Sequence, residues 1–364
     1  MPFSLAVTPL RLAFRDPFRI ARSLEDRFAE TFIVELRPQA AARSSAASDA
    51  GDGPSGLGEA FPDPYFGENT VTVPALLPGL LAVAESVDEP RETAPEALLA
   101  WLERVSVAMD AHIGGHGAAK AAIDIALHDR AAKRAGLPLH ALFGLPAELP
   151  PTDFTLGIDA PAVVAERAAR AAHFPALKIK VGGPSDLETL EAVRAVYSGP
   201  IRVDANTGWQ PEEGARLVPE LVRLGVELIE QPFPRQQLAQ LRWLQERSPL
   251  PIVADESAIT IEDLDGLVGV VAGVNVKLMK CGGVGAAYRM LRRARELGFK
   301  LFLGCMEETS VGIAASAAVA SLVDWVDLDG NLLLAADPYT GLELDDACRW
   351  RLPAAPGLGV SRRS

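Results

Sequence analysis

The chain has 364 residues, of which 49% are hydrophobic and 23% are charged, and its formal net charge is −13. This composition is ordinary for a globular protein with one large domain or two unequal ones. The acidic excess disfavours nucleic acid and anionic membranes as partners. Three separated cysteines, Cys281, Cys305 and Cys348, do not suggest a disulfide framework or a zinc site. The N-terminal segment lacks a membrane-spanning stretch and a signal-type apolar region, so we expect a cytoplasmic protein.

The first third of the chain predicts a separate α+β domain. Alternating hydrophobic and polar residues predict antiparallel strands in SLAVTPLRLAF, ETFIVELRP and GLGEAFP. Between the last two, AARSSAASDAGDGPSG (residues 41–56) predicts a flexible hairpin tip. Apolar residues recurring at intervals of three and four predict helices from about residue 74 to residue 142.

From about residue 152 the pattern changes to strands that alternate with helices. The strand candidates are DFTLGI, LKIKV, IRVDA, VELIEQ, PIVADE, GVNVKL, KLFLGC and WVDLDG. Eight such units in roughly 180 residues fit a closed (β/α) barrel better than an open sheet. The remaining C-terminal stretch contains no further unit of this kind, and we expect it to pack on the first domain.

Charged residues recur at the ends of these predicted strands. They are Lys180, Asp204, Glu230, Asp255, Lys277 and the pair Asp327 and Asp329. The active sites of such barrels lie at the C-terminal ends of the strands. One such charge alone could cap the next helix, but a whole series in register, lysines included, predicts an active site.

Three of these residues predict a magnesium site. Asp204, Glu230 and Asp255 end three successive strands, so their carboxylates can converge on one hard cation such as Mg²⁺. None of the five histidines lies near these positions, which disfavours zinc. Asn206 has the same strand parity as Asp204 and is expected to orient a ligand.

The lysines predict two opposed bases. Lys178 and Lys180 are two residues apart and face the same side of a strand, where each should lower the pKa of the other. Lys277 is placed two strands beyond Asp255, on the far side of the barrel, so that two bases could remove and return one proton. Lys280 differs from Lys277 in parity, and alternation favours Lys277 as the inward residue, with Lys280 in the following turn.

The motifs LKIKVGG, VDANTGW, IEQP, ADES and NVKLMKCGG resemble those of the enolase superfamily, specifically its muconate-lactonizing subgroup. The resemblance covers most of the barrel and implies a (β/α)7β-type TIM barrel with an N-terminal α+β capping domain that the C-terminal segment completes. The implied limits are residues 1–125 for the capping domain, 126–335 for the barrel and 336–364 for the returning segment. It also implies that Lys180 and Lys277 are the two bases and that Mg²⁺ stabilises an enediolate.

The reaction within the subgroup depends on Asp327 and Asp329. The subgroup contains cycloisomerases, o-succinylbenzoate synthases, N-acylamino acid racemases and dipeptide epimerases. The Asp-Leu-Asp pattern resembles the one that holds the N-terminal ammonium group of a dipeptide in the epimerases. Substrates without a cation would leave both carboxylates unpaired, which is costly. As an alternative, Asp329 caps the loop that begins at Gly330.

The resemblance also implies a set of residues that choose the substrate. Among Arg19, Arg22 and Arg27, Arg22 is the preferred partner for a glutamate side chain. The other substrate-binding positions are Thr155, Lys178, Cys305, Met306 and Glu307. The negative charge of Glu307 could instead favour a cationic side chain.

We therefore expect an isomerase that uses Mg²⁺ to epimerise L-Ala-D/L-Xaa dipeptides by two-base proton transfer, with Glu as the first candidate for Xaa. The alternatives are a cycloisomerase, an o-succinylbenzoate synthase or an N-acylamino acid racemase, and more remotely a non-catalytic binding protein. The expected partner is a small dipeptide, without nucleic acid or membrane, and a homo-oligomer stays open.

Overall fold

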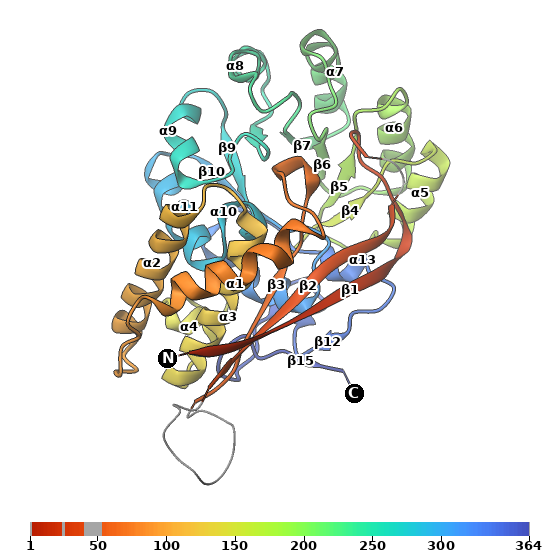
Figure 1. The fold of residues 1–364 in the computed structure, drawn as a ribbon. Helices are drawn as coiled ribbons and strands as arrows, with labels where there is room; N and C mark the ends of the chain where they lie inside the picture. Colours follow the sequence, from red (N-terminus) through yellow and green to blue (C-terminus); the bar gives the residue numbers. More distant parts are fainter. Residues whose placement is uncertain (1, 24–25, 40–52, 364) are drawn as a thin grey trace, which may run out of the picture.

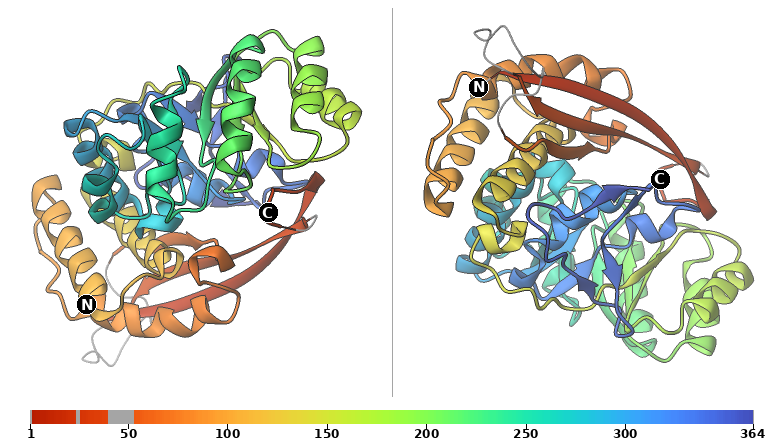
Figure 2. Two further views of the ribbon diagram at one scale, coloured as in Figure 1. Left: turned by 90° about the horizontal axis from the view of Figure 1, so that it is seen from above. Right: turned by 90° about the horizontal axis from the view of Figure 1, so that it is seen from below.

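The computed structural model describes residues 2–23, 26–39 and 53–363. Most of the hairpin tip expected at residues 41–56 therefore lies outside the described residues. An α+β layer from the N-terminal part of the chain packs beside a barrel (Figures 1 and 2). The expected α/β barrel with an N-terminal capping domain is thereby confirmed.

In the described residues, the capping domain contains one antiparallel sheet in the order β1-β2-β3. Its strands are β1 (Phe3–Phe18), β2 (Asp26–Pro38) and β3 (Gly56–Ala60). The pairing of β1 with β2 runs from Phe3 opposite Pro38 to Ala13 opposite Phe28, and the register shifts before Phe18. This long ribbon extends from the N-terminus towards the barrel (Figure 1).

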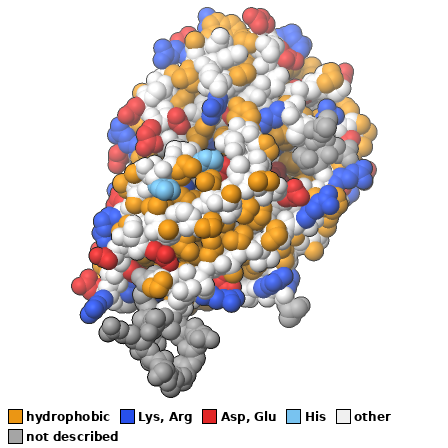
Figure 3. Space-filling view, viewed as in Figure 1, with side chains coloured by type: hydrophobic (Ala, Val, Ile, Leu, Met, Phe, Trp, Pro, Cys, Tyr) orange, Lys and Arg blue, Asp and Glu red, His pale blue; other side chains and the backbone are white. Residues whose placement is uncertain are grey.

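Helices cover the core-facing side of this sheet. They are α1 (Thr72–Glu85), α2 (Pro95–His112), α3 (Gly117–Ala135) and the short α4 (Leu139–Leu142), and η1 (Pro64–Phe66) precedes them. Hydrophobic side chains gather over α1 and the neighbouring strands, with acidic and basic groups interspersed around the edge (Figure 3). None of the helices in the described ranges combines the length and apolar character needed to span a bilayer.

Two glycines allow β3 to approach the alanine-rich helix α3. A Cβ atom added at Gly56 would lie 1.9 Å from the carbonyl oxygen of Ala126, and one at Gly58 would lie 2.1 Å from that of Ala122. Such distances are far below van der Waals contact, so the GLG motif is required by packing. The predicted domain boundary at residue 125 falls inside α3, and the division at residues 125 and 335 stays a prediction.

The barrel consists, within the described chain, of an eight-stranded parallel sheet in the order β4 to β11. A further bridge between Thr152 and Val326 joins its first and last strands and closes it. The strands are β4 (Phe154–Leu156), β5 (Leu177–Lys180), β6 (Ile201–Asp204), β7 (Val226–Glu230), β8 (Ile252–Ala254), β9 (Gly273–Val276), β10 (Lys300–Gly304) and β11 (Trp325–Asp327). Each coincides with one of the predicted strand segments.

Helices surround the barrel and connect its strands (Figure 2). They are α5 (Pro161–Arg170), α6 (Asp186–Val196), α7 (Pro211–Arg223), α8 (Leu238–Gln245), η2 (Ile261–Asp263), α9 (Leu264–Leu267), α10 (Leu278–Cys281), α11 (Val284–Glu296), α12 (Ser310–Ala317), η3 (Ala320–Leu322) and α13 (Gly330–Leu333). The last strand is followed only by the single-turn helix α13, which agrees with the (β/α)7β type.

The C-terminal segment forms two small ladders and packs on α3. The ladders pair β12 (Tyr339–Thr340) with β15 (Ser361–Arg362) and β13 (Glu343–Leu344) with β14 (Trp350–Arg351). The amide of Leu358 donates to Asp129 of α3 over 2.8 Å.

A buried carboxylate joins the capping sheet to the barrel. Glu59 of β3 is fully buried and accepts hydrogen bonds from Thr309 N at 3.0 Å and from Gly312 N at 2.9 Å, at the start of α12. The hydroxyl groups of Thr31 and Thr309 also donate to it, over 2.9 and 2.7 Å. Negative charge is favourable at a helix N-terminus, so Glu59 fixes the sheet against α12.

Candidate active site

A cavity of about 910 Å³ lies between the barrel mouth and the capping sheet. Its barrel side is formed by the C-terminal ends of the strands, as expected for this architecture. Of the predicted site residues, those that line the cavity are Arg22, Thr155, Lys178, Lys180, Lys277, Cys305, Met306, Glu307, Asp327 and Asp329. The structure thus brings Arg22 and Asp329, which are 307 positions apart in the sequence, to one cavity.

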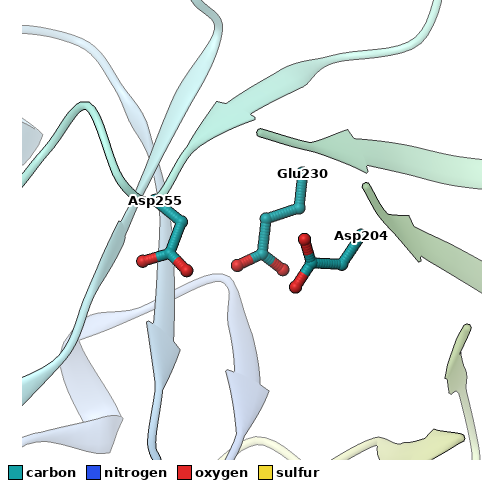
Figure 4. A group of neighbouring side chains, drawn as sticks. All are labelled: Asp204, Glu230 and Asp255. Carbon is teal, nitrogen blue, oxygen red and sulfur yellow. The ribbon is translucent and has the colours of Figure 1, made fainter. Parts of the chain in front are cut away.

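The carboxylates of Asp204, Glu230 and Asp255 converge beneath this cavity (Figure 4). One oxygen atom of each lies within 4.8 Å of the others, and all three side chains are buried. Asp204 accepts a hydrogen bond from the backbone N–H of Asn206 over 2.9 Å, and Glu230 accepts one from Asn275 Nδ2 over 2.7 Å. The expected orienting role of Asn206 therefore belongs to its backbone, and Asn275 is an orienting residue that sequence reasoning missed.

This donor set fits Mg²⁺. Glu230 Oε2 is buried and has no hydrogen-bond partner among the described residues. Burial and the neighbouring Asp204 raise the pKa of Glu230 to about 8. A buried carboxylate oxygen that accepts no hydrogen bond and lies close to two further carboxylates is an environment that a hard divalent cation relieves.

Lys180 and Lys277 lie on opposite sides of the carboxylates. Lys180 ends β5 and donates to Asp204 over 2.6 Å, and Lys277 follows β9 and lies 2.9 Å from Asp255. In an eight-stranded barrel, β5 and β9 are four strands apart and face each other across the lumen. Lys277 is one strand beyond Asp255 rather than the expected two, because β9 directly follows β8.

Nearby carboxylates raise the pKa values of Lys178 and Lys277. Burial lowers the pKa of Lys178, but the carboxylates of Asp327 and Glu230 outweigh it and raise this pKa well above its ordinary value. Burial also lowers the pKa of Lys277, but the carboxylates of Asp255 and Glu230 outweigh burial, and the pKa is raised. The expected lowering by a neighbouring ammonium group is wrong for Lys178, because carboxylates are nearer.

Lys280 was expected in a turn, but it lies in α10, and its ammonium group is directed into the protein. It donates to the carboxylate of Asp255 and to the backbone oxygens of Asp255, Asn275 and Ala258, the last two over 2.9 and 3.0 Å. Burial opposes ionisation of Asp255, but Lys277 and Lys280 together hold its pKa well below the ordinary range. Lys280 therefore fixes Asp255, one of the three converging carboxylates. Of Lys277 and Lys280, only Lys277 lines the cavity.

Asp327 and Asp329 lie together at the end of β11. Asp327 contacts the ammonium group of Lys178, and its other oxygen accepts from the Thr155 hydroxyl over 3.2 Å. Asp329 accepts from the backbone N–H of Thr155 over 2.6 Å. Burial and the charge of Asp327 raise the pKa of Asp329 to about 7. Asp329 also stands directly before α13, but its side chain forms no capping hydrogen bond there, so the structure does not support the alternative role in capping.

Arg22 reaches the barrel from the loop between β1 and β2. It forms an ion pair with Glu256, lies 3.6 Å from Asp63 and stacks on the ring of Tyr65 at 4.4 Å. Glu256 follows Asp255 directly and was not among the predicted residues, although it belongs to the ADES motif. Two carboxylates thus already surround Arg22, whose pairing with a substrate side chain stays a prediction.

The segment after β10 forms another wall of the cavity. Cys305, Met306 and Glu307 line it, and the next residue, Glu308, accepts a hydrogen bond from Met306 N over 2.8 Å. Burial raises the pKa of Glu307, which forms no ion pair within 4.0 Å among the described residues. Of the other arginines considered, Arg19 contributes its backbone oxygen to Ile158 N over 2.8 Å.

Comparison with known proteins agrees with this geometry. Residues 51–144 match the mandelate racemase / muconate lactonizing enzyme N-terminal domain, and residues 162–363 match the enolase C-terminal domain-like family. An L-Ala-D/L-Glu epimerase of Bacteroides thetaiotaomicron is 39% identical over 315 residues, which are 85% of this chain and 79% of that protein. An L-Ala-D/L-amino acid epimerase of Pedosphaera parvula is 38% identical over 86% of this chain and 88% of its own.

Solved structures show the same similarity over the full length. A dipeptide epimerase from Enterococcus faecalis, complexed with Mg and L-Leu-L-Tyr, has a TM-score of 0.86 at 30% identity and covers 100% of both chains. An L-Ala-D/L-Glu epimerase from Bacillus subtilis has a TM-score of 0.85 at 27% identity and covers 99% of both. This chain belongs to the mandelate racemase and muconate lactonizing enzyme family of the enolase superfamily.

Proposed function

We propose that this protein is a Mg²⁺-dependent dipeptide epimerase that inverts the α-carbon of the second residue. The observation that carries the proposal is the arrangement of Lys180 and Lys277 on opposite sides of three converging carboxylates, next to Asp327 and Asp329. The relatives named as dipeptide epimerases support it.

Asp327 and Asp329 bind the N-terminal ammonium group of the dipeptide. Both are almost fully buried at the cavity wall, and Thr155 orients both through its N–H and hydroxyl groups. Lys178 already pairs with Asp327, so the pair carries one further carboxylate, Asp329, for which a free ammonium group supplies a cation and an acylated amine does not. This distinguishes a free dipeptide from muconate, succinylbenzoate and N-acylamino acids.

Asp204, Glu230 and Asp255 hold the metal. Bound to these three carboxylates, Mg²⁺ would neutralise the charge that grows on the substrate carboxylate, and the carboxylates would then be less available to pair with the lysines. The Asn206 backbone, Asn275 and Lys280 keep these three side chains in place. With the carboxylate end fixed here and the ammonium end at β11, the second α-carbon lies between the two lysines.

Lys180 and Lys277 move the proton. One lysine, as the neutral amine, removes the α-proton from its side of the carbon, and the other, as the ammonium ion, delivers a proton to the opposite side. Since β5 and β9 face each other across the barrel, each lysine serves one configuration. The reverse reaction exchanges these roles.

The test is to incubate the enzyme with Mg²⁺ and L-Ala-L-Glu, together with a panel of other dipeptides, in D₂O and to follow the α-protons by NMR. We expect deuterium at the second α-carbon and appearance of the epimer. In Lys180→Ala and Lys277→Ala, epimerisation falls by a factor of about 10³ or more. Each variant still exchanges the one configuration that faces its remaining lysine.

A structural defect in the variants would abolish exchange of both configurations, whereas loss of a single base is stereospecific. Asp327→Asn is expected to weaken dipeptide binding severely, which a cycloisomerase or o-succinylbenzoate synthase would not require. No exchange with any dipeptide of the panel contradicts the proposal.

A further inference from the structure

An apolar wall borders the part of the cavity that contains Asp327 and Asp329. It consists of Phe14 and Phe18 at the end of β1 and Leu333 at the end of α13, and all three line the cavity. The rings of Phe14 and Phe18 are in contact, with their centroids 5.8 Å apart. Hydrophobic side chains therefore line the same cavity as the two buried carboxylates.

Backbone contacts hold the end of β1 against the segment that follows α13. Phe14 forms a bridge with Leu334, and the N–H of Ala335 donates to the oxygen of Ala13 over 2.7 Å. At β4, a Cβ atom on Gly157 would lie 3.3 Å from the ring of Phe18. Gly157 thus permits the close approach of Phe18 to the rim of the barrel.

The wall lies near the expected ammonium site. Leu333 N donates to Asp329 O over 3.2 Å, so Leu333 is one helical turn beyond Asp329 and on the same side of α13. Thr155 of β4, whose N–H binds Asp329, is two residues before Gly157, so the segment that Phe18 approaches is also the one that binds Asp329.

The position of this wall relative to the substrate follows from covalent geometry. The ammonium nitrogen and the side chain of the first residue are attached to the same α-carbon. When Asp327 and Asp329 bind the ammonium group, that side chain is directed into the cavity that Phe18 and Leu333 also line. The second α-carbon lies deeper, between Lys180 and Lys277, and its side chain is directed elsewhere.

Resting on the proposed function, we infer that Phe14, Phe18 and Leu333 form a subsite for a large apolar side chain on the first residue of the dipeptide. Alanine in this position would leave the wall without a contact. Dipeptides that begin with leucine or a residue of similar size are the better substrates, because their side chains displace water from this apolar surface.

The experiment measures kcat/KM, by α-proton exchange in D₂O, for L-Ala-L-Glu, L-Leu-L-Glu, L-Ala-L-Leu and L-Leu-L-Leu. We expect leucine at the first position to raise kcat/KM by about tenfold or more, whichever residue follows. In Leu333→Ala and Phe18→Leu, the ratio of the leucine-first to the alanine-first substrate falls by about fivefold. This ratio does not depend on the fraction of active enzyme, so partial misfolding cannot produce the result.

Leu332→Ala is the matched control, because Leu332 lies on the same short helix and packs against the core instead of lining the cavity. It should leave the ratio unchanged. Equal or better use of alanine at the first position, or a preference for leucine only at the second position, overturns this inference while the proposed function stands. Exchange with none of the four dipeptides, nor with any other of the panel, overturns both.

Discussion

The ammonium group of Lys178 lies between the carboxylates of Asp327 and Glu230, at 3.7 Å from the latter. Lys178 thus connects the pair Asp327 and Asp329, which is predicted to bind an ammonium group, to the converging carboxylates Asp204, Glu230 and Asp255. It also lies over the ring of Phe302, at 5.7 Å from its centroid, inside the barrel. Such a fully enclosed lysine is stable only because several carboxylates surround it.

The raised pKa of Asp329, about 7, predicts a pH dependence of substrate binding. The ammonium group of a dipeptide is attracted by the ionised carboxylate and not by the protonated acid. The fraction of Asp329 that is ionised decreases about tenfold for each pH unit below 7. KM should therefore rise as the pH falls through this value.

Measuring KM between pH 5.5 and 8.5 checks this expectation. Asp329→Asn is the comparison, because it should raise KM throughout and remove the part of the pH dependence that belongs to this group. An unchanged pH dependence of KM in the variant would contradict the assignment to Asp329.

The start of α12 is the element that joins the two parts of the molecule. Glu59 binds N–H groups of Thr309 and Gly312 there, directly after the segment that contains Met306 and Glu307. A capping-domain side chain therefore sets the position of a cavity wall that belongs to the barrel.

Replacing Glu59 should destabilise this contact in a graded way. Glu59→Leu leaves buried N–H groups of Thr309 and Gly312 without an acceptor, at a cost of about 1–3 kcal/mol each in the free energy of unfolding. Glu59→Gln retains one acceptor oxygen and should cost less. Denaturant unfolding measures both effects, with Glu103→Leu on the exposed face of α2 as the control. Equal stability of Glu59→Leu and the control would show that the contact contributes nothing.

The sheet order explains how one molecule can offer two opposed bases and a metal site. Strands β5 to β9 are consecutive around the barrel, so they carry Lys180, the three carboxylates and Lys277 in that order. The capping sheet then covers this rim with β1 and with Arg22.

At this scale, Mg²⁺ should stabilise the whole fold, because the converged carboxylates exist only in the native state. At a concentration of 100 times its dissociation constant, a ligand of the native state contributes about 2.7 kcal/mol. Thermal unfolding in Mg²⁺ should therefore occur several degrees higher than in EDTA. Glu230→Gln should remove most of this difference, and an equal shift in that variant would place the metal elsewhere.

Local patterns were sufficient for much of the fold and part of the site. The period of strand and helix predicted β4 to β11, and strand-end position predicted that Asp204, Glu230 and Asp255 would meet. Parity correctly placed Lys178, Lys180 and Lys277 inside the barrel, since alternation along a strand is set by the backbone.

The partners of these residues could not be predicted in the same way. Lys280 reaches Asp255 because α10 turns it back into the barrel, and Arg22 meets Glu256 because β1 and β2 cross the rim. The pKa of Lys178 was misjudged for the same reason, since its nearest carboxylate is 149 residues away.

The sequence by itself determined the barrel, the strand ends that carry charge and the chemical type of the metal site, because each depends on a short-range period. Only the tertiary structure decided which charges pair, how β1 docks on β4 and α13, and what surrounds Asp327 and Asp329. These depend on contacts between segments hundreds of residues apart, where small changes in packing decide which side chains touch.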